Sequence, residues 1–246
     1  MRRLLPPSEK HVDAAEAVAA DRTPPDDRPW VLLNMIASVD GAAVVEGKSG
    51  GLGSDADREV FHQLRGVADV ILVAAGTVRA EGYGPARPRA EVRAARVSRG
   101  QAEVPPIAVI TGSVNLDWSA PFFTDAESRP IVITTPEADE ERLAQARKHA
   151  DVIALGGRRI DFAAALGQLR ARGHEVALLE GGPSINGILY GLDLIDELNL
   201  TIAPSLVGGD PIGILRGVAL PERRGLRLLQ VLEQDSYLFL RYVRWP

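Results

Sequence analysis

The feature that most constrains the fold is a change in pattern near residue 190. Before it, short apolar runs typical of buried strands alternate with helical patterns. The strand-like runs lie at 30–37, 69–75, 107–111, 131–135, 151–155 and 175–180, and the helical patterns at 54–67, 136–150, 162–172 and 183–190. After it, 197–207 and 236–245 alternate like strands, and we expect them to pair antiparallel. The sequence therefore predicts an α/β fold, with a mixed, mostly parallel sheet, antiparallel C-terminal strands and helices on both faces.

The N-terminal residues differ from the rest of the sequence. Residues 1–29 are polar and carry five prolines, so we expect a loosely ordered arm followed by one domain over 30–246. The arm lacks the apolar core of a signal peptide, and no apolar run is long enough to cross a membrane. We expect a cytoplasmic protein with no membrane partner. Residues 85–104 are rich in Arg and predict an excursion whose arginines are mostly solvated.

Composition excludes several kinds of chemistry. The protein has no Cys, which removes thiolate metal sites and cysteine nucleophiles. Its four histidines do not stand at metal-ligand spacing, so we expect no metal centre. A net charge of −5 with 5% aromatic residues makes nucleic acid an improbable partner.

The most informative motif is Gly181-Gly182-Pro183-Ser184, between a predicted strand and a predicted helix. Adjacent glycines let a ligand approach the backbone, and a helix N-terminus offers N–H groups to a pyrophosphate. An ordinary tight turn that needs glycine explains the same residues.

Other small or polar residues follow predicted strands. Asp40 comes after the first strand, Gly76 and Thr77 come after the second, and each could be only a turn or a packing site. Ser54 can cap the 54–67 helix, with Asp57 three residues on. Arg65 shares a helix face that is either a phosphate clamp or solvated. A dinucleotide cofactor explains most of these clusters together.

The order of these motifs resembles a known family. SVDG at 38–41, LGSDADREVFHQLR at 52–65, ADVILVAAGTVRAE at 68–81, LLEGGPSINGILY at 178–190 and DELNLTIAPSLVGG at 196–209 are similar to the riboflavin-biosynthesis pyrimidine reductases. The similarity covers about residues 29–246. It implies a dihydrofolate-reductase-like fold and an NADPH-dependent reduction by hydride transfer. The implied substrate is 5-amino-6-(5-phosphoribosylamino)uracil, a phosphorylated pyrimidine, and the implied product is its ribitylamino form.

The resemblance also implies roles for individual residues. Cofactor-binding residues would be Gly76 and Thr77 near the nicotinamide, Thr111, Ser113 and Gly156 near the adenosine 2′-phosphate, and Gly181, Gly182, Pro183 and Ser184 at the pyrophosphate. Substrate-binding residues would be Ser38, Ser54, Arg65 and Glu180. Asp40 and Glu81 are the candidate proton donors. Family members are commonly dimers, so we expect a homodimer.

One segment departs from the family pattern. The sequence reads EGYGP at 81–85, and the arginine expected to bind ribose phosphate is out of register, although Arg87 or Arg89 could replace it. Two alternatives therefore stay open. One is a dihydrofolate or pterin reductase on the same fold, and the other is a non-catalytic NADPH-binding protein.

Overall fold

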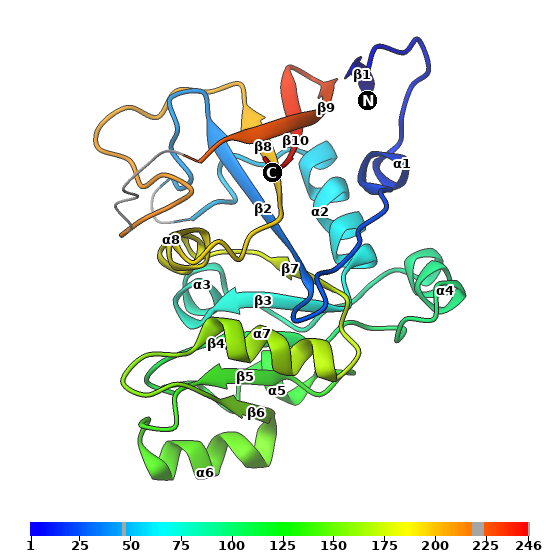
Figure 1. Cartoon of the computed structure of the whole chain (residues 1–246). Helices are drawn as coiled ribbons and strands as arrows, with labels where there is room; N and C mark the ends of the chain where they lie inside the picture. The colour runs from blue at the N-terminus through cyan, green and yellow to red at the C-terminus, as the bar shows by residue number, and fades with distance from the viewer. Residues whose placement is uncertain (46–47, 218–223, 246) are drawn as a thin grey trace. The chain divides into compact units, whose positions relative to one another are not determined.

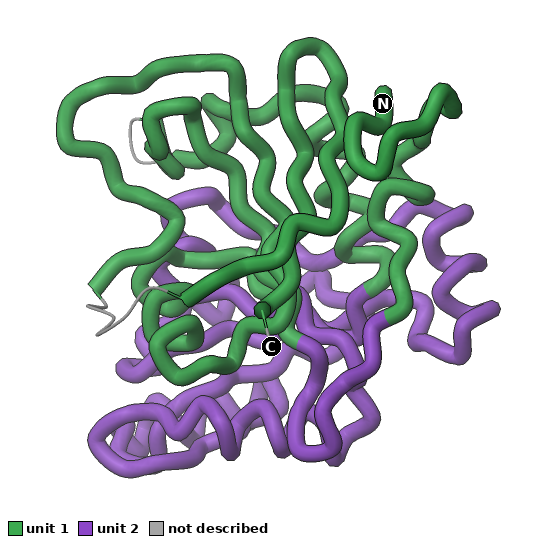
Figure 2. Tube along the Cα trace, turned by 45° about the horizontal axis from the view of Figure 1, so that its top comes forward, with its two compact units in different colours: residues 1–21, 31–67, 179–246 green, residues 22–30, 68–178 purple. Residues whose placement is uncertain are grey.

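The computed structural model describes residues 1–45, 48–217 and 224–245. The protein forms two compact units, coloured separately in Figure 2. Unit 1 comprises Met1–Asp21, Val31–Val67 and Leu179–Pro246, and unit 2 comprises Arg22–Trp30 and Ala68–Leu178. The boundary between an arm and one domain at residue 30 stays a prediction.

Unit 1 contains a mixed sheet (Figure 1). Its strands are β1 (Arg2–Leu5), β9 (Leu226–Gln234), β10 (Tyr237–Arg244), β8 (Glu197–Ala203) and β2 (Trp30–Ser38), in that order across the sheet. β2 and β8 are parallel, and the other neighbouring strands pair antiparallel. Its helices are α1 (Ala14–Val18), α2 (Asp55–Val67) and α8 (Pro183–Gly191). The predicted cap of α2 is confirmed, because the Asp57 amide donates to Ser54 Oγ at 3.1 Å.

The predicted antiparallel pairing of the last two strand patterns is confirmed by β8 and β10. Strand β9, which forms a hairpin with β10, was not predicted. The register of this hairpin shifts between Arg241 and Tyr242, and such a bulge breaks the alternation that marks a strand in sequence. The turn residues Asp235 and Ser236 have φ of 54° and 68°. Asn-Gly is the usual sequence signal for a turn of this conformation, and Asp-Ser is a weaker one.

The expectation of a loosely ordered N-terminal arm is wrong for its first part. β1 pairs antiparallel with β9 at the edge of the sheet. Helix α1 is closed by a capping box between Asp13 and Glu16, and it packs beside α2. Ala14, Ala17 and Val18 of this helix are buried, and so is Val12 just before it. A few apolar side chains at helical spacing therefore anchor a segment whose average composition is polar.

Unit 2 contains the parallel strands β3 (Val70–Ala74), β4 (Ile107–Ile110), β5 (Ile131–Thr134) and β6 (Asp151–Ala154), with β7 (Val176–Leu179) beyond β3. Strands β3, β4 and β5 are buried, whereas β6 is only partly buried. Its helices are α3 (Ala75–Glu81), α4 (Ala90–Ser98), α5 (Pro121–Thr124), α6 (Glu140–His149) and α7 (Phe162–Ala171). α6 and α7 both pack on β6. Parallel strands buried on both faces read as continuous apolar runs, as this sequence does. The predicted mixed α/β class is confirmed.

One arginine of the 85–104 segment is not solvated. Arg96, in α4, is fully buried and donates from Nε to the Ala102 carbonyl at 2.7 Å and from Nη1 to the Ala68 carbonyl at 2.5 Å. Burial lowers the pKa of its guanidinium to about 10. Arg96 therefore connects α4 to other parts of unit 2 through hydrogen bonds in the interior.

Candidate active site

The predicted site residues fall into two groups, one in each unit. Unit 1 holds Ser38, Asp40, Ser54, Arg65, Glu180, Gly181, Gly182, Pro183 and Ser184. Unit 2 holds Gly76, Thr77, Glu81, Thr111, Ser113 and Gly156.

In unit 1, two predicted substrate residues form one ion pair. Arg65, in the last turn of α2, donates from Nε to Glu180 Oε1 and from Nη2 to Glu180 Oε2, each at 2.7 Å. The side chains are 16% and 1% exposed, and the guanidinium lies 4.4 Å from the centre of the Phe61 ring. A bidentate pair of this kind holds both groups in a fixed orientation. A substrate phosphate at Arg65 would therefore share the guanidinium with Glu180, and both substrate roles stay predictions.

The turn after β2 is held by Asp40. Its carboxylate accepts hydrogen bonds from Ser38 Oγ at 2.5 Å, from the Val207 amide at 3.1 Å and from the Gly208 amide at 2.7 Å. These bonds lower the pKa of Asp40 to about 2, with Ser38 the largest contributor. Asp40 is ionised at neutral pH and carries no proton to donate. The geometry gives it the role of a hydrogen-bond acceptor.

The double glycine ends at the N-terminus of α8. Gly181 has φ of 96°, which L-residues rarely adopt, and the Gly181–Gly182 peptide bond is cis. Gly182 is the extended N-cap residue, and Pro183 occupies the first helical turn, as predicted. Among the described residues, no side-chain group caps this helix end. The first-turn amides are therefore available to an anionic ligand, and Ser184 is exposed in this turn.

Behind this turn, α8 packs against residues 214–216. Asn186 is fully buried and donates from Nδ2 to the Ile214 carbonyl at 2.9 Å. A Cβ on Gly187 would lie 2.3 Å from the Arg216 carbonyl oxygen, so only glycine allows this approach. Neither contact was predicted from the sequence, because the two segments are far apart in it.

Asp57 is a site candidate that sequence reasoning treated only as a helix-start residue. Burial raises the pKa of its carboxyl group, while a hydrogen bond with the Thr201 side chain and the charge of Arg58 lower it in part. Ser54, whose substrate role is predicted, caps the same helix turn. The pairing with Thr201 depends on how β8 packs against α2, which no local motif reveals.

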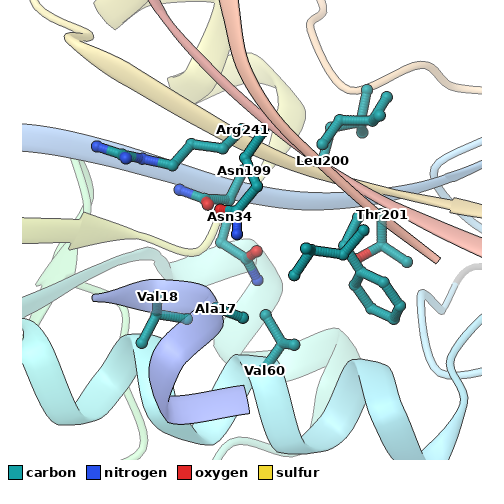
Figure 3. A pocket seen from close by; sticks show the side chains of 12 residues that line it. Ala17, Val18, Asn34, Val60, Asn199, Leu200, Thr201 and Arg241 are labelled. Carbon is teal, nitrogen blue, oxygen red and sulfur yellow. The ribbon is translucent and has the colours of Figure 1, made fainter. Parts of the chain in front are cut away.

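A row of polar side chains crosses the sheet of unit 1. Asn34, Asn199, Arg241 and Gln230 stand in register on β2, β8, β10 and β9. They line a pocket with Ala17 and Val18 of α1 and Val60 of α2 (Figure 3). Glu197 accepts from Arg241 Nε and from Asn199 Nδ2, each at 2.9 Å. The polar side chains of this row can therefore form hydrogen bonds in the pocket that they line with residues of α1 and α2.

In unit 2, the cofactor candidates follow parallel strands and so lie at one edge of the sheet. Gly76 and Thr77 form the first turn of α3, whose start has no side-chain cap within the described part of the protein, and a Cβ on Gly76 would meet open space. Thr111 is buried, and its Oγ1 accepts from the Val114 amide at 3.1 Å. Ser113 is exposed, and its carbonyl accepts from Arg142 Nη1 at 3.1 Å.

The remaining two candidates have more local explanations. Gly156 has φ of 101°, and a Cβ there would lie 2.2 Å from the Arg159 carbonyl oxygen. Its own turn therefore requires glycine, whether or not a ligand binds. Glu81 is the partly exposed last residue of α3. The cofactor role of Gly156 and the catalytic role of Glu81 stay predictions.

Comparison with known proteins identifies the family. Residues 29–236 match the model of the RibD C-terminal domain. Because this match spans most of the sequence, the protein belongs to the RibD C-terminal domain family.

Relatives of known name agree with this. The protein is 32% identical over 184 residues to the 2,5-diamino-6-ribosylamino-4(3H)-pyrimidinone 5′-phosphate reductase of Methanothermobacter thermautotrophicus, covering 74% of this protein and 81% of the relative. It is 33% identical over 197 residues to the reductase of the same name from Aquifex aeolicus, covering 78% and 84%. A solved pyrimidine reductase-like protein from Corynebacterium diphtheriae superposes with a TM-score of 0.82 at 27% identity, covering 96% and 100%. The predicted fold and family resemblance are confirmed.

The described residues lack two other features. Within residues 1–45, 48–217 and 224–245, no three His, Asp or Glu side chains gather as a metal site. In the same ranges, no helix combines the length and apolar character needed to span a bilayer.

Proposed function

We propose that this protein is an NADPH-dependent reductase of a pyrimidine ribosylamino 5′-phosphate in riboflavin biosynthesis. The observation that carries the proposal is membership of the RibD C-terminal domain family, with reductases of this name matched over more than four-fifths of their length. The uncapped, glycine-led N-terminus of α8 supports it, since a cofactor pyrophosphate suits such a helix end.

The base of the substrate has two candidates. The family resemblance suggests the 5-aminouracil compound, whereas the relatives from Methanothermobacter and Aquifex are named for the 2,5-diaminopyrimidinone. Both carry a ribosylamino group and a 5′-phosphate and differ in the group at C2 of the ring. The chemistry proposed here acts on the sugar carbon, so it is the same for both bases.

Each unit, taken by itself, offers candidate residues for the cofactor. In unit 1, Gly182, Pro183 and Ser184 would hold the pyrophosphate at the start of α8. In unit 2, Gly76 leaves open space at the start of α3, and Arg142 offers positive charge beside Ser113 for a 2′-phosphate. When bound, NADPH would supply a hydride, which is one proton with two electrons, to the sugar carbon of the ring-opened imine. The protein aligns the substrate.

The nitrogen of the reduced imine must take up one proton. Asp40 has lost its proton at neutral pH, because its pKa is about 2. Asp57 is better suited, since burial raises the pKa of its carboxyl group. It stands at the helix turn capped by Ser54, which the resemblance assigns to the substrate. We therefore propose Asp57 as the proton-holding group of unit 1, with Glu81 of unit 2 as the alternative.

The reaction is tested by following NADPH absorbance with three substrates side by side: the diaminopyrimidinone phosphate, the aminouracil phosphate and dihydrofolate. We expect oxidation with at least one of the pyrimidine phosphates, and slower oxidation when NADH replaces NADPH. Turnover of dihydrofolate alone would make the protein a pterin reductase. Tight NADPH binding without oxidation of any substrate would make it a non-catalytic binding protein.

The role of Asp57 is tested by D57N, with D55N on the same helix as an exposed, charge-matched control. D57N should lower kcat by about 100-fold, the scale of lost general-acid catalysis, with little change in KM. T201V removes a bond that lowers the Asp57 pKa, so activity should persist to higher pH in this variant. An unchanged alkaline limit in T201V would assign the proton to another group.

The expected homodimer also belongs to this proposal. On β10, Leu238, Leu240 and Tyr242 alternate with Phe239 and Val243, which are buried, and the first three are half-exposed. A half-exposed apolar sheet face suits a second copy of the protein. Light scattering after gel filtration should give twice the 26.4 kDa mass of one copy. The cytoplasmic location and the absence of a metal stay predictions.

A further inference from the structure

Residues 205–216, which follow β8, are fastened to the turn after β2. The Val39 amide donates to the Ser205 carbonyl at 2.9 Å, and the Ala43 amide donates to the Ile212 carbonyl at 2.8 Å. Between these bonds, the Asp40 carboxylate accepts from the Val207 and Gly208 amides. The first part of the segment is therefore held by the 38–43 turn, with Asp40 as its charged anchor.

The far end of the same segment is fastened to the first turns of α8. The Arg216 amide donates to the Pro183 carbonyl at 2.9 Å, and the Asn186 side chain donates to the Ile214 carbonyl at 2.9 Å. The Arg216 carbonyl also lies where only a glycine at position 187 leaves room. One segment thus bonds to both the 38–41 motif and the 181–184 motif.

We propose that residues 205–216 act as a strut that sets the position of the α8 N-terminus relative to the 38–41 turn, with Asp40 and Asn186 as its two positioning residues. The inference rests on the proposed function, in which these motifs serve the substrate and the cofactor. Asp40 and Asn186 act through the strut backbone. This assigns Asp40 a role other than the catalytic one predicted from the sequence.

Two physical points favour this role. The bonds to Asp40 are charge-assisted, and such bonds are about twice as strong as neutral ones. Asn186 is fully buried, and removal of its amide would take away the hydrogen bond that the Ile214 carbonyl accepts from it. Each of the bonds above leads from the strut to one of the two motifs, so a disturbance at one end can shift the other.

The first test is hydrogen exchange on the protein without ligands, which does not depend on the proposed function. D40N should speed exchange of the Val207 and Gly208 amides, and also of the Arg216 amide at the far end. N186L should do the reverse, speeding Arg216 first and then Val207 and Gly208. If N186L does not fold, N186S replaces it, because serine is too short to reach Ile214. Faster exchange confined to the altered end in both variants would overturn the strut.

The second test separates the effects on the two ligands. N186L should weaken NADPH binding and, through the strut, raise the substrate KM about five-fold, the size of a modest coupling between sites. D40N should raise the substrate KM and weaken NADPH binding by a similar factor, and D40E should restore part of the loss. D210N, an exposed change of equal charge within the strut, is the control and should match the wild type. An effect of each variant on only one ligand would contradict the proposal, even if the reductase reaction itself is established.

Discussion

The two units hold their candidate residues by different means. In unit 1, charged side chains are fixed by partners far away in the sequence: Arg65 by Glu180, and Asp40 by the amides of Val207 and Gly208. In unit 2, Thr111 and Gly156 are shaped by their own turns, and Gly76 faces open space. In unit 1, a single substitution can therefore remove a contact that holds several candidate residues in place. In unit 2, a single substitution is expected to fill the space where a ligand would bind.

The largest expected effect is on the free energy of unfolding, and it concerns the ion pair of unit 1. R65A leaves Glu180 buried without its cationic partner, which should lower the free energy of unfolding by ~3–5 kcal/mol. R142A in unit 2 removes one hydrogen bond to the exposed Ser113 and should cost about 1 kcal/mol or less. Urea unfolding curves of both variants give these values. The double variant R65M/E180L should recover most of the loss, and similar losses in R65A and R142A would remove the distinction between the units.

The next effect concerns the pyrophosphate position of unit 1. Gly182 has φ of −81° and ψ of 171°, a conformation open to any residue, so G182V should fold. Its side chain would stand where the cofactor is proposed to meet the backbone, and NADPH affinity should fall at least about ten-fold, or ~1.4 kcal/mol. Fluorescence titration with NADPH measures this. Unchanged affinity in the folded variant would move the pyrophosphate elsewhere.

A smaller effect is expected at the open edge of unit 2. G76V adds a side chain where the structure has free space, so stability should change little. If the nicotinamide side of the cofactor lies there, the KM for NADPH should rise by several-fold. A90V makes a similar addition in the first turn of α4, another exposed helix start in this unit, and should leave the KM unaltered. Equal KM values for all three proteins would remove Gly76 from the cofactor site.

The smallest effect is a contribution of Asp40 to acid stability. Because its pKa is lowered from 3.8 to about 2, its hydrogen bonds stabilise the fold fully above pH 3.8. This contribution is lost as the pH falls from 3.8 toward 2. Thermal unfolding midpoints across this range should fall less steeply for D40N than for the wild type. Parallel curves would show that these bonds do not stabilise the folded state.

Much of the fold could be predicted because its signals are local. The apolar runs that became β3, β4 and β5 are continuous, since parallel strands are buried on both faces. Strand β9 was missed because a bulge disturbs its alternation, and α1 because its few buried side chains lie in a polar segment. Both failures come from tertiary context that overrides average composition.

The candidate site divides in the same way. The GGPS motif and the cap of α2 were predictable, since a glycine pair before a helix and a Ser before an acidic first turn are local signals. The pairing of Arg65 with Glu180 and the bond between Asp57 and Thr201 were not, because each joins residues that only the folded protein brings together. Sequence motifs show where candidate site residues lie along the sequence. Which groups these residues contact depends on the tertiary structure.

The hairpin turn near the C-terminus is a suitable place for substitutions that stabilise the protein. Asp235 and Ser236 both hold left-handed backbone, which costs most L-residues roughly 1–2 kcal/mol each. Asn followed by Gly is the pair that such tight connections favour. Asp235→Asn and Ser236→Gly are therefore the first substitutions to try where a more stable protein is needed for crystallisation or long assays. Because β10 pairs with both β9 and β8, a more stable hairpin would also stabilise these two strands.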